Sequence, residues 1–344
     1  MEGGADIDAV DRFGSQPLDE AVRVGATAVA AFLTDLGAGT AKAEERTAQF
    51  LNACSVGDTD LIRFMLANGQ PPGSADYDAR SGLMLAVGGG HFSAVTTLLG
   101  AGAPPDAADA FGGSALTEAI KLRRRDMVDL LVSAGARLAW PTERAAGTLC
   151  QAAAEGDAAL IAMYAAAGLA VNAGDYDSRR ASHIAAADGS AGALTALLGA
   201  GADINATDRW GATAMLEAVK AVAAGKAEAG LIDTVAAAGG RLGMAENELS
   251  GVLCSAVHAG DGALLALYLR AGADPSAADY DRRTPLHIAA AEGALEAVQA
   301  LVAAGADTRA ADRWGHIPLD EARREKRGPV IDFLTTQAGG SGRR

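Results

Sequence analysis

The sequence is poor in aromatic residues and in net positive charge. Only 4% of its 344 residues are Phe, Trp or Tyr, while half are apolar. Ala supplies much of that apolar half, and the chain has 43 Gly besides, which suits many thin helices lying close together rather than one large core. The formal net charge of −14 excludes a basic surface that would bind nucleic acid through its phosphates. We therefore expect many small helices and no nucleic-acid partner.

Long apolar runs and export signals are also missing. No stretch of 18 apolar residues occurs, and the nearest approach, residues 152–171, is interrupted by Glu155 and Asp157. The N-terminus lacks the basic and apolar pattern of a signal peptide. The sequence thus predicts a soluble cytoplasmic protein without membrane insertion. Its cysteines, an odd number spaced about a hundred residues apart, are expected to be reduced and buried: Cys54, Cys150 and Cys254.

Motifs for chemistry are absent as well. The chain has no Ser-x-x-Lys, Gly-x-Ser-x-Gly, His-Glu-x-x-His or phosphate-binding Gly-x-x-x-x-Gly-Lys. We predict a chain that is not an enzyme and that uses no cofactor or metal.

What is present is a repeat. Asp76 to Asp109, Asp175 to Asp208 and Asp279 to Asp312 each span 33 residues, a period typical of stacked helical repeats. In the clearest unit, Thr284 is a favourable N-cap and Pro285 a favourable first helical residue. Gly293 can take the left-handed conformation that ends this first helix. A second helix from Leu295 follows, and one such unit must stack on its neighbours to be stable.

The stretch TPLHIAAAEG, followed by LVAAGAD, resembles an ankyrin repeat. The resemblance implies an all-α ankyrin solenoid with short β-hairpin fingers, and it covers nearly the whole chain in about ten units. These form a cycle of three kinds: one with a Gly-Asp turn, one opening with DYD and one opening with DRW-G or similar. We predict one array divided at about 1–39, 40–138, 139–242 and 243–339, with a flexible tail at 340–344.

The triplet also resembles the C-terminal ankyrin region of glutaminases and the ankyrin segments of asparaginases and plant outward potassium channels. In those families the repeats accompany another domain. Two functions therefore stay open: a non-catalytic scaffold that binds a protein partner through finger loops and inner helices, and a detached accessory region of a larger enzyme or channel. The absence of catalytic motifs favours the first.

Two departures from the ankyrin pattern carry predictions. Arg180 stands where the capping Thr belongs, so the helix after it should start poorly, and Arg180→Thr should raise the thermal midpoint. Five extra residues fall within 221–230, between the two helices of one unit, where a loop can absorb them. The resemblance assigns His183 and His287 a structural hydrogen-bonding role, which we favour over metal binding. Cys150 and Cys254 share a packing position with Leu51.

The aromatics recur at fixed finger positions, with an Arg three residues after each finger Tyr. Adjacent fingers should bring a Tyr, an Arg and a Trp or Phe together, and such residues are typical interface anchors. They either contact a partner or only stiffen the stack, and rings more than a third exposed would favour the partner. The candidate partner-binding residues are Phe13, Tyr77, Arg80, Phe111, Tyr176, Arg179, Arg209, Trp210, Tyr280, Arg283, Arg313 and Trp314.

A glutamate recurs early in the third kind of unit, as Glu20, Glu118, Glu217 and Glu321. The helix dipole favours a carboxylate there, although an acidic stripe for basic peptides is an alternative. The first unit begins without a preceding helix pair, so apolar surface is expected around Leu18, Ala21, Phe32 and Leu33, and this surface could mediate self-association.

Overall fold

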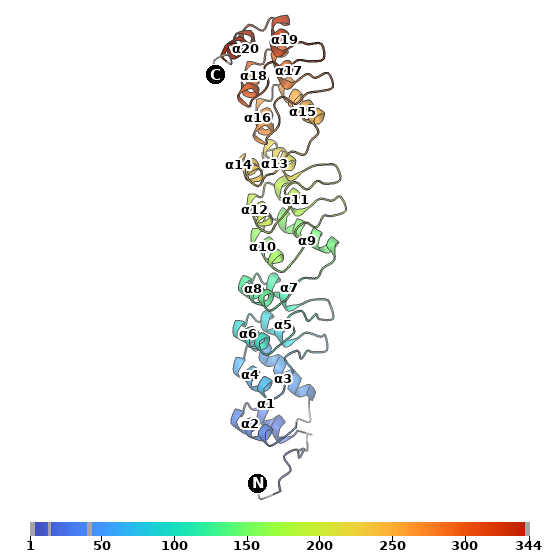
Figure 1. Cartoon of the computed structure of the whole chain (residues 1–344). Coiled ribbons are helices and arrows are strands. Elements are labelled where there is room, and N and C mark those ends of the chain that lie inside the picture. The colour runs from blue at the N-terminus through green and yellow to red at the C-terminus, as the bar shows by residue number, and fades with distance from the viewer. Residues whose placement is uncertain (1–3, 13–14, 40–42, 341–344) are drawn as a thin grey trace. The chain divides into compact units, whose positions relative to one another are not determined.

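The computed structural model describes residues 4–12, 15–39 and 43–340, and within them all regular structure is helical. Figure 1 shows the helices following one another in pairs joined by tight turns, with fingers projecting between successive pairs. The described fingers contain isolated antiparallel bridges and no extended strands: Ala75 with Ser81, Ala108 with Ser114, and Gly174 with Arg180. The predicted all-α solenoid is confirmed, and three of the described fingers are turns closed by a single bridge each.

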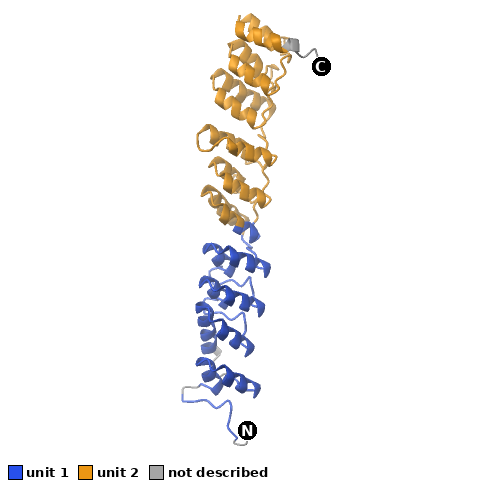
Figure 2. Cartoon of the chain, turned by 90° about the vertical axis from the view of Figure 1, so that its left-hand side faces the viewer, with its two compact units in different colours: residues 1–140, 163–169 blue, residues 141–162, 170–344 orange. Residues whose placement is uncertain are grey.

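The chain divides into two compact units, coloured separately in Figure 2. The first comprises residues 1–140 and 163–169. In it, α1, α3, α5 and α7 pack in a row, and each contacts the second helix of its own pair. Its helices are α1 (Pro17–Arg23), α2 (Thr27–Asp35), α3 (Ala43–Val56), α4 (Thr59–Ala67), α5 (Gly82–Gly88), α6 (Phe92–Gly100), α7 (Ala115–Lys121) and α8 (Arg125–Ser133).

The second unit comprises residues 141–162 and 170–344, so α10 (Ala158–Ala166) has residues in both units. Within it, α9, α11 and α13 pack in one row, and α15, α17 and α19 in another. Its other helices are α9 (Thr142–Ala154), α11 (Ala181–Ala187), α12 (Ala191–Gly199), α13 (Ala214–Ala223), α14 (Gly230–Ala237), α15 (Glu246–His258), α16 (Gly262–Arg270), α17 (Pro285–Glu292), α18 (Leu295–Ala303), α19 (Pro318–Arg324) and α20 (Gly328–Gly340).

The unit read from the sequence forms as expected. Helix α17 starts at Pro285 after Thr284, and it ends at Gly293, whose φ of 77° is left-handed. The capping detail differs, because the Thr284 hydroxyl lies 2.9 Å from Nδ1 of His287. The hydroxyl is therefore engaged by the buried imidazole at the start of the helix. In α18, Val298 and Leu301 are fully buried, which places the apolar side of this helix in the core.

Helix α11 forms despite its weak start. It begins at Ala181 directly after Arg180, whose side chain provides no cap. The backbone N–H of Arg180 instead donates to Nδ1 of His183 at 3.1 Å. The helix has seven residues, as does α5 at the same place in its triplet. The expected stability gain of Arg180→Thr stays a prediction.

The insertion is absorbed partly by a helix. Helix α13 has 10 residues, whereas α7 at the same place in its triplet has 7. The rest lengthens the connection between Ala223 and Gly230. A purely looped insertion was therefore wrong, since Ala221 and Val222 continue the helical apolar pattern and Ala221 is buried.

The first unit of the array differs from expectation. Leu18 and Ala21 were expected at an uncovered surface, but they are buried because α1 packs against both α2 and α3. Phe32 is exposed as expected, and Leu33 is half-buried. Further exposed apolar side chains lie after α1 or on and next to α2: Val24, Val29 and Leu36. The triplet boundaries stay a prediction, and of the predicted tail Gly340 ends α20, while residues 341–344 lie outside the described residues.

Candidate functional site

Each finger tip is shaped by an aspartate that binds the backbone of its own turn. Asp175 Oδ1 accepts the N–H of Asp177 at 2.9 Å and that of Arg179 at 2.8 Å. The carboxylate closes a four-residue loop and leaves the side chain after it at the tip. The same pair of bonds occurs at Asp76, Asp109, Asp208, Asp279 and Asp312.

The DYD fingers also hold a non-glycine residue in the left-handed region. Ala79, Ser178 and Arg282 have φ values of 60°, 57° and 58°. Such a conformation is uncommon for residues with a Cβ and costs about 1 kcal/mol. The aspartate bonds hold this turn, and the same tip geometry recurs in all three triplets.

The tip rings are exposed to solvent. The described rings range from 60% exposed for Trp314 to 102% for Tyr77. All therefore exceed the one-third level that distinguishes a partner-contacting ring from one that only stiffens the stack. The six rings are Tyr77, Phe111, Tyr176, Trp210, Tyr280 and Trp314. Phe13, predicted to belong to the set, lies outside the described residues.

Adjacent fingers are joined by what we term the finger clamp, in which an Arg links an Asp of one finger to the Trp of the next. The backbone N–H of Arg209 donates to the Asp177 carbonyl at 2.9 Å, and its Nη1 donates to Asp177 Oδ1 at 2.7 Å. The guanidinium carbon lies 5.6 Å from the Tyr176 ring centre and 5.3 Å from that of Trp210. Both distances are typical of cation–π contacts.

The last triplet repeats the clamp and the first lacks its side chain. The backbone N–H of Arg313 donates to the Asp281 carbonyl at 2.9 Å, and its Nη1 donates to Asp281 Oδ1 at 2.6 Å. The guanidinium carbon of Arg313 lies 5.3 Å from the centre of the Trp314 ring. In the first triplet Ala110 stands at this place, and only its backbone N–H reaches the Asp78 carbonyl, at 2.8 Å. Phe111 therefore lies on a finger without a guanidinium bridge.

The arginines three residues after each Tyr lie elsewhere. Arg283 approaches Glu321 at 3.7 Å and lines a pocket of about 410 Å³ together with Trp314, His316 and Arg324. Arg80 lines a smaller hollow of about 50 Å³ with Glu118 and Lys121 at the same place in the first triplet. Arg179 is half-buried. Of the candidate arginines named from the sequence, Arg209 and Arg313 form the clamps, and Arg283 lines a pocket with Trp314. Their role in binding a partner stays a prediction.

The recurring glutamate forms an ion pair with a cation one turn later. Glu217 lies 2.9 Å from Lys220, and Glu118 lies 3.5 Å from Lys121. Glu20 pairs in the same way with Arg23, and Glu321 pairs with Arg324. Because these carboxylates are engaged within their own helices, the structure favours their structural role over an acidic stripe for basic peptides.

One cluster has ligand atoms within reach of a single metal ion. Oxygens or nitrogens of Asp312, His316 and Glu321 lie within 4.8 Å of one another. Burial pushes the pKa of Asp312 up, but the backbone N–H groups of His316 and Trp314 lower it overall. Glu321 is bound by Arg283 and Arg324. The arrangement is therefore well described as an ion-pair network.

The two histidines of the TPLH position have the expected structural role. His287 is fully buried, accepts the Thr284 N–H at Nδ1 at 3.1 Å, and donates from Nε2 to the His316 carbonyl at 3.1 Å. Burial lowers its pKa. His183 likewise contacts the Ala206 and Ala212 carbonyls at 3.0 and 3.1 Å. Each ring links the start of its helix to the next finger.

The cysteines are free thiols. Burial raises the pKa of Cys54 to about 12 and that of Cys150 to about 11, and it also raises the pKa of Cys254. Their thiolate forms are therefore scarce near neutral pH, as expected for packing residues.

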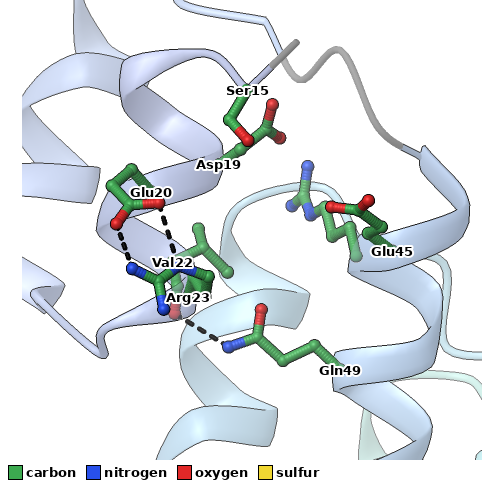
Figure 3. Close-up of a pocket in the computed structure, with 8 residues that line it drawn as sticks. Ser15, Asp19, Glu20, Val22, Arg23, Glu45 and Gln49 are labelled. Atoms are coloured by element: carbon green, nitrogen blue, oxygen red, sulfur yellow. Dashed lines mark hydrogen bonds and ion pairs between the residues drawn. The ribbon is translucent and has the colours of Figure 1, made fainter. Parts of the chain in front are cut away.

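A third hollow, of about 270 Å³, lies between α1 and α3 (Figure 3). Its charged groups bind one another or the backbone. Arg23 Nε donates to Glu20 at 2.9 Å, and Gln49 donates to the Val22 carbonyl at 3.0 Å. Burial lowers the pKa of Arg46, which also lines this hollow. We interpret the site as a polar seam between the first two repeats.

Comparison with known proteins identifies two stretches of the chain as ankyrin repeats. Residues 50–139 match a family model described as ankyrin repeats in three copies, and residues 268–322 match one described as ankyrin repeats in many copies. The resemblance predicted from the sequence is confirmed over these ranges. Ankyrin repeats in general mediate contacts between proteins and are in general not catalytic.

Three relatives illustrate where such repeats occur. The potassium channel KOR2 of Oryza sativa subsp. japonica is 47% identical over 87 residues, which are 25% of this chain and 12% of the channel. L-asparaginase of Dirofilaria immitis is 33% identical over 176 residues, 51% of this chain and 29% of the enzyme. The mitochondrial liver isoform of glutaminase from Mus musculus is 41% identical over 83 residues, which are 24% of this chain and 14% of the enzyme. The chain thus spans less than a third of these relatives.

Among the described residues, no helix is long and apolar enough to cross a membrane.

Proposed function

We propose that the chain is a non-catalytic scaffold that binds a protein partner through the rings of its fingers and the adjoining inner helices. The observation that carries this proposal is the exposure of all six described finger rings in a chain with few aromatics. Large aromatic side chains are usually well buried, and Tyr, Trp and Arg dominate binding energy at protein interfaces.

The clamps add preorganisation. A ring held beside a guanidinium that is itself fixed to an aspartate loses little freedom when a partner binds. Trp210 and Trp314 are each held in this way, at 5.3 Å from Arg209 and Arg313. The net charge of −14 would speed the approach of a positively charged partner at low salt.

The test uses peptides selected from a phage-displayed random library on the immobilised full chain. Hydrogen exchange with the best binder should show protection at the finger tips, residues 175–179, 208–212, 279–283 and 312–316. Trp210→Ala combined with Trp314→Ala should weaken binding at least tenfold. The matched control is Phe92→Ala, which removes a ring that is 44% exposed on helix α6, away from the fingers. Protection confined to the second helix of each pair, with no effect of the Trp changes on binding, would refute the proposal.

The alternative is that the repeats form an accessory region of a larger enzyme or channel. It is favoured by the small share of each relative that the chain covers, between 8% and 29%. An antibody against the repeats, used on an extract of the source cells, tests it by the size of the native polypeptide. A band near 34.5 kDa supports the stand-alone scaffold, and a much larger band supports the accessory region.

A further inference from the structure

The finger clamp occurs twice within the second compact unit, and the two copies match closely. The backbone bond between the fingers is 2.9 Å in both, and the Arg-to-Asp side-chain bond is 2.7 Å at Arg209 and 2.6 Å at Arg313. The guanidinium carbon lies 5.3 Å from the centre of each Trp ring. Each clamp adjoins an exposed tyrosine, Tyr176 in one and Tyr280 in the other.

We propose that these clamps are two equivalent sites for one short peptide element, and that the natural partner carries this element twice. The inference rests on the proposed function. The Asp, Arg and Trp of the two clamps lie at nearly the same distances, so an element that contacts the Arg and the Trp of one clamp also fits the other. Arg209 additionally lies 5.6 Å from the centre of the Tyr176 ring. The first triplet contributes no equal site, because Ala110 and Phe111 replace the Arg and the Trp.

The spacing defines the partner further. Trp210 and Trp314 lie three repeats apart within the unit. Helices pack at roughly 8–10 Å, so the two sites are separated by roughly 25–30 Å. An extended chain covers at most about 3.5 Å per residue, so roughly seven to nine residues or more must separate the two elements of the partner. Simultaneous binding then makes the second contact intramolecular and raises the apparent affinity.

The two clamps differ in the residues around them, so the affinity of the peptide for the two sites should differ. The Tyr280 hydroxyl accepts a hydrogen bond from Asn247 at 3.0 Å, and Trp314 borders the pocket of about 410 Å³. The last clamp therefore offers additional contact surface. We expect the same peptide at both sites, bound more tightly at Trp314.

The experiment uses a library-selected peptide whose binding is lost in the double variant Trp210→Ala, Trp314→Ala. Calorimetric titration should give two peptides per wild-type chain, and one for each single variant. Both rings are at least 60% exposed, so the variants should fold, as circular dichroism will check. A stoichiometry of one, with one single variant binding like the wild type, overturns the two-site inference. If no selected peptide depends on either Trp, the proposed function itself fails.

A tandem peptide tests the bivalent partner. Two copies joined by about twenty Gly and Ser residues have a mean reach of roughly 25 Å. The tandem should bind the wild-type chain at least tenfold more tightly than the single peptide, and either single Trp change should abolish that gain. A matched tandem with a three-residue linker cannot span the sites and should show no gain. Equal affinity of the long tandem and the single peptide would overturn the bivalent partner.

Discussion

Gly57 and Gly260 occupy the same position in two triplets and differ in the space around them. Both are left-handed, with φ values of 77° and 66°. A Cβ added to Gly57 would lie 2.5 Å from Cγ of His91, whereas a Cβ on Gly260 would meet nothing within 4 Å. The difference arises because Ala294 stands in the third triplet where His91 stands in the first, which leaves an open groove lined by Val257 and Leu295.

We predict that Gly260→Ala costs about 1 kcal/mol, the cost of a left-handed residue with a Cβ. Gly57→Ala pays the same cost and also displaces the imidazole, whose Nε2 lies 3.0 Å from the Ser55 carbonyl. Overpacking typically adds about 1–3 kcal/mol and the lost hydrogen bond about 1 kcal/mol. The total for Gly57→Ala should thus be about 3–5 kcal/mol.

Native-state hydrogen exchange of peptides covering α4 and α6, or α16 and α18, measures both changes as local opening free energies. The double-mutant cycle with His91→Ala supplies the control: in that background Gly57→Ala should cost only about 1 kcal/mol. Equal costs at the two glycines, or a cost at Gly57 that His91→Ala does not relieve, would refute the steric argument.

Three further predictions concern single side chains. The variant His287→Met carries the residue that stands at the same place in the first triplet, Met84. The pKa of His287 in the folded state lies below its ordinary 6.5. The stability that the neutral imidazole contributes is therefore present above pH 6.5 and is lost as the pH falls. The exchange-derived stability gap between wild type and variant in α17 should therefore narrow by up to about 1.4 kcal/mol per pH unit below 6.5, and a constant gap would contradict this. With a pKa of about 12, Cys54 should react with Ellman's reagent at pH 8 only on unfolding, unlike a free peptide thiol; rapid labelling of the native chain would show an accessible thiolate. Arg180→Thr should raise the thermal midpoint, because a Thr hydroxyl there can bond Nδ1 of His183 as Thr284 bonds that of His287. Such a bond contributes about 1 kcal/mol, and the ion pair lost to Asp203 at 3.4 Å contributes less. Arg180→Ala is the control, and equal midpoints for the two variants would mean that the Thr hydroxyl adds no stability.

The repeat and its helices were predictable because local signals are strong. Thr284, Pro285 and Gly293 specify the ends of α17 through backbone preferences that depend little on the rest of the chain. The finger rings were also identifiable, since they recur at two fixed places in every triplet, a Tyr in one finger and a Trp or Phe in the next. The solvent exposure of these rings could not be predicted from the sequence. A ring packed on the next finger and a ring facing solvent have the same spacing in the sequence.

The clamp was harder to foresee for a geometric reason. Arg209 directly follows the finger residue Asp208, whereas Arg179 lies four residues after Asp175, and the turn at each tip decides where the side chain points. The left-handed residue Ser178 reverses the chain before Arg179, whereas Arg209 comes before its turn and so meets Asp177. The burial of Leu18 and Ala21 was missed because the partner of α1 was sought before it in the chain rather than after it.

The link between neighbouring fingers has a consequence for how this surface can change. In all three triplets the bond runs from a backbone N–H to the carbonyl of Asp78, Asp177 or Asp281, and it forms even where the donor residue is Ala110. Main-chain groups are the same for every residue except proline. The finger tips can therefore exchange their side chains while the frame beneath them keeps its register, so that one array can acquire new ligands without being refolded.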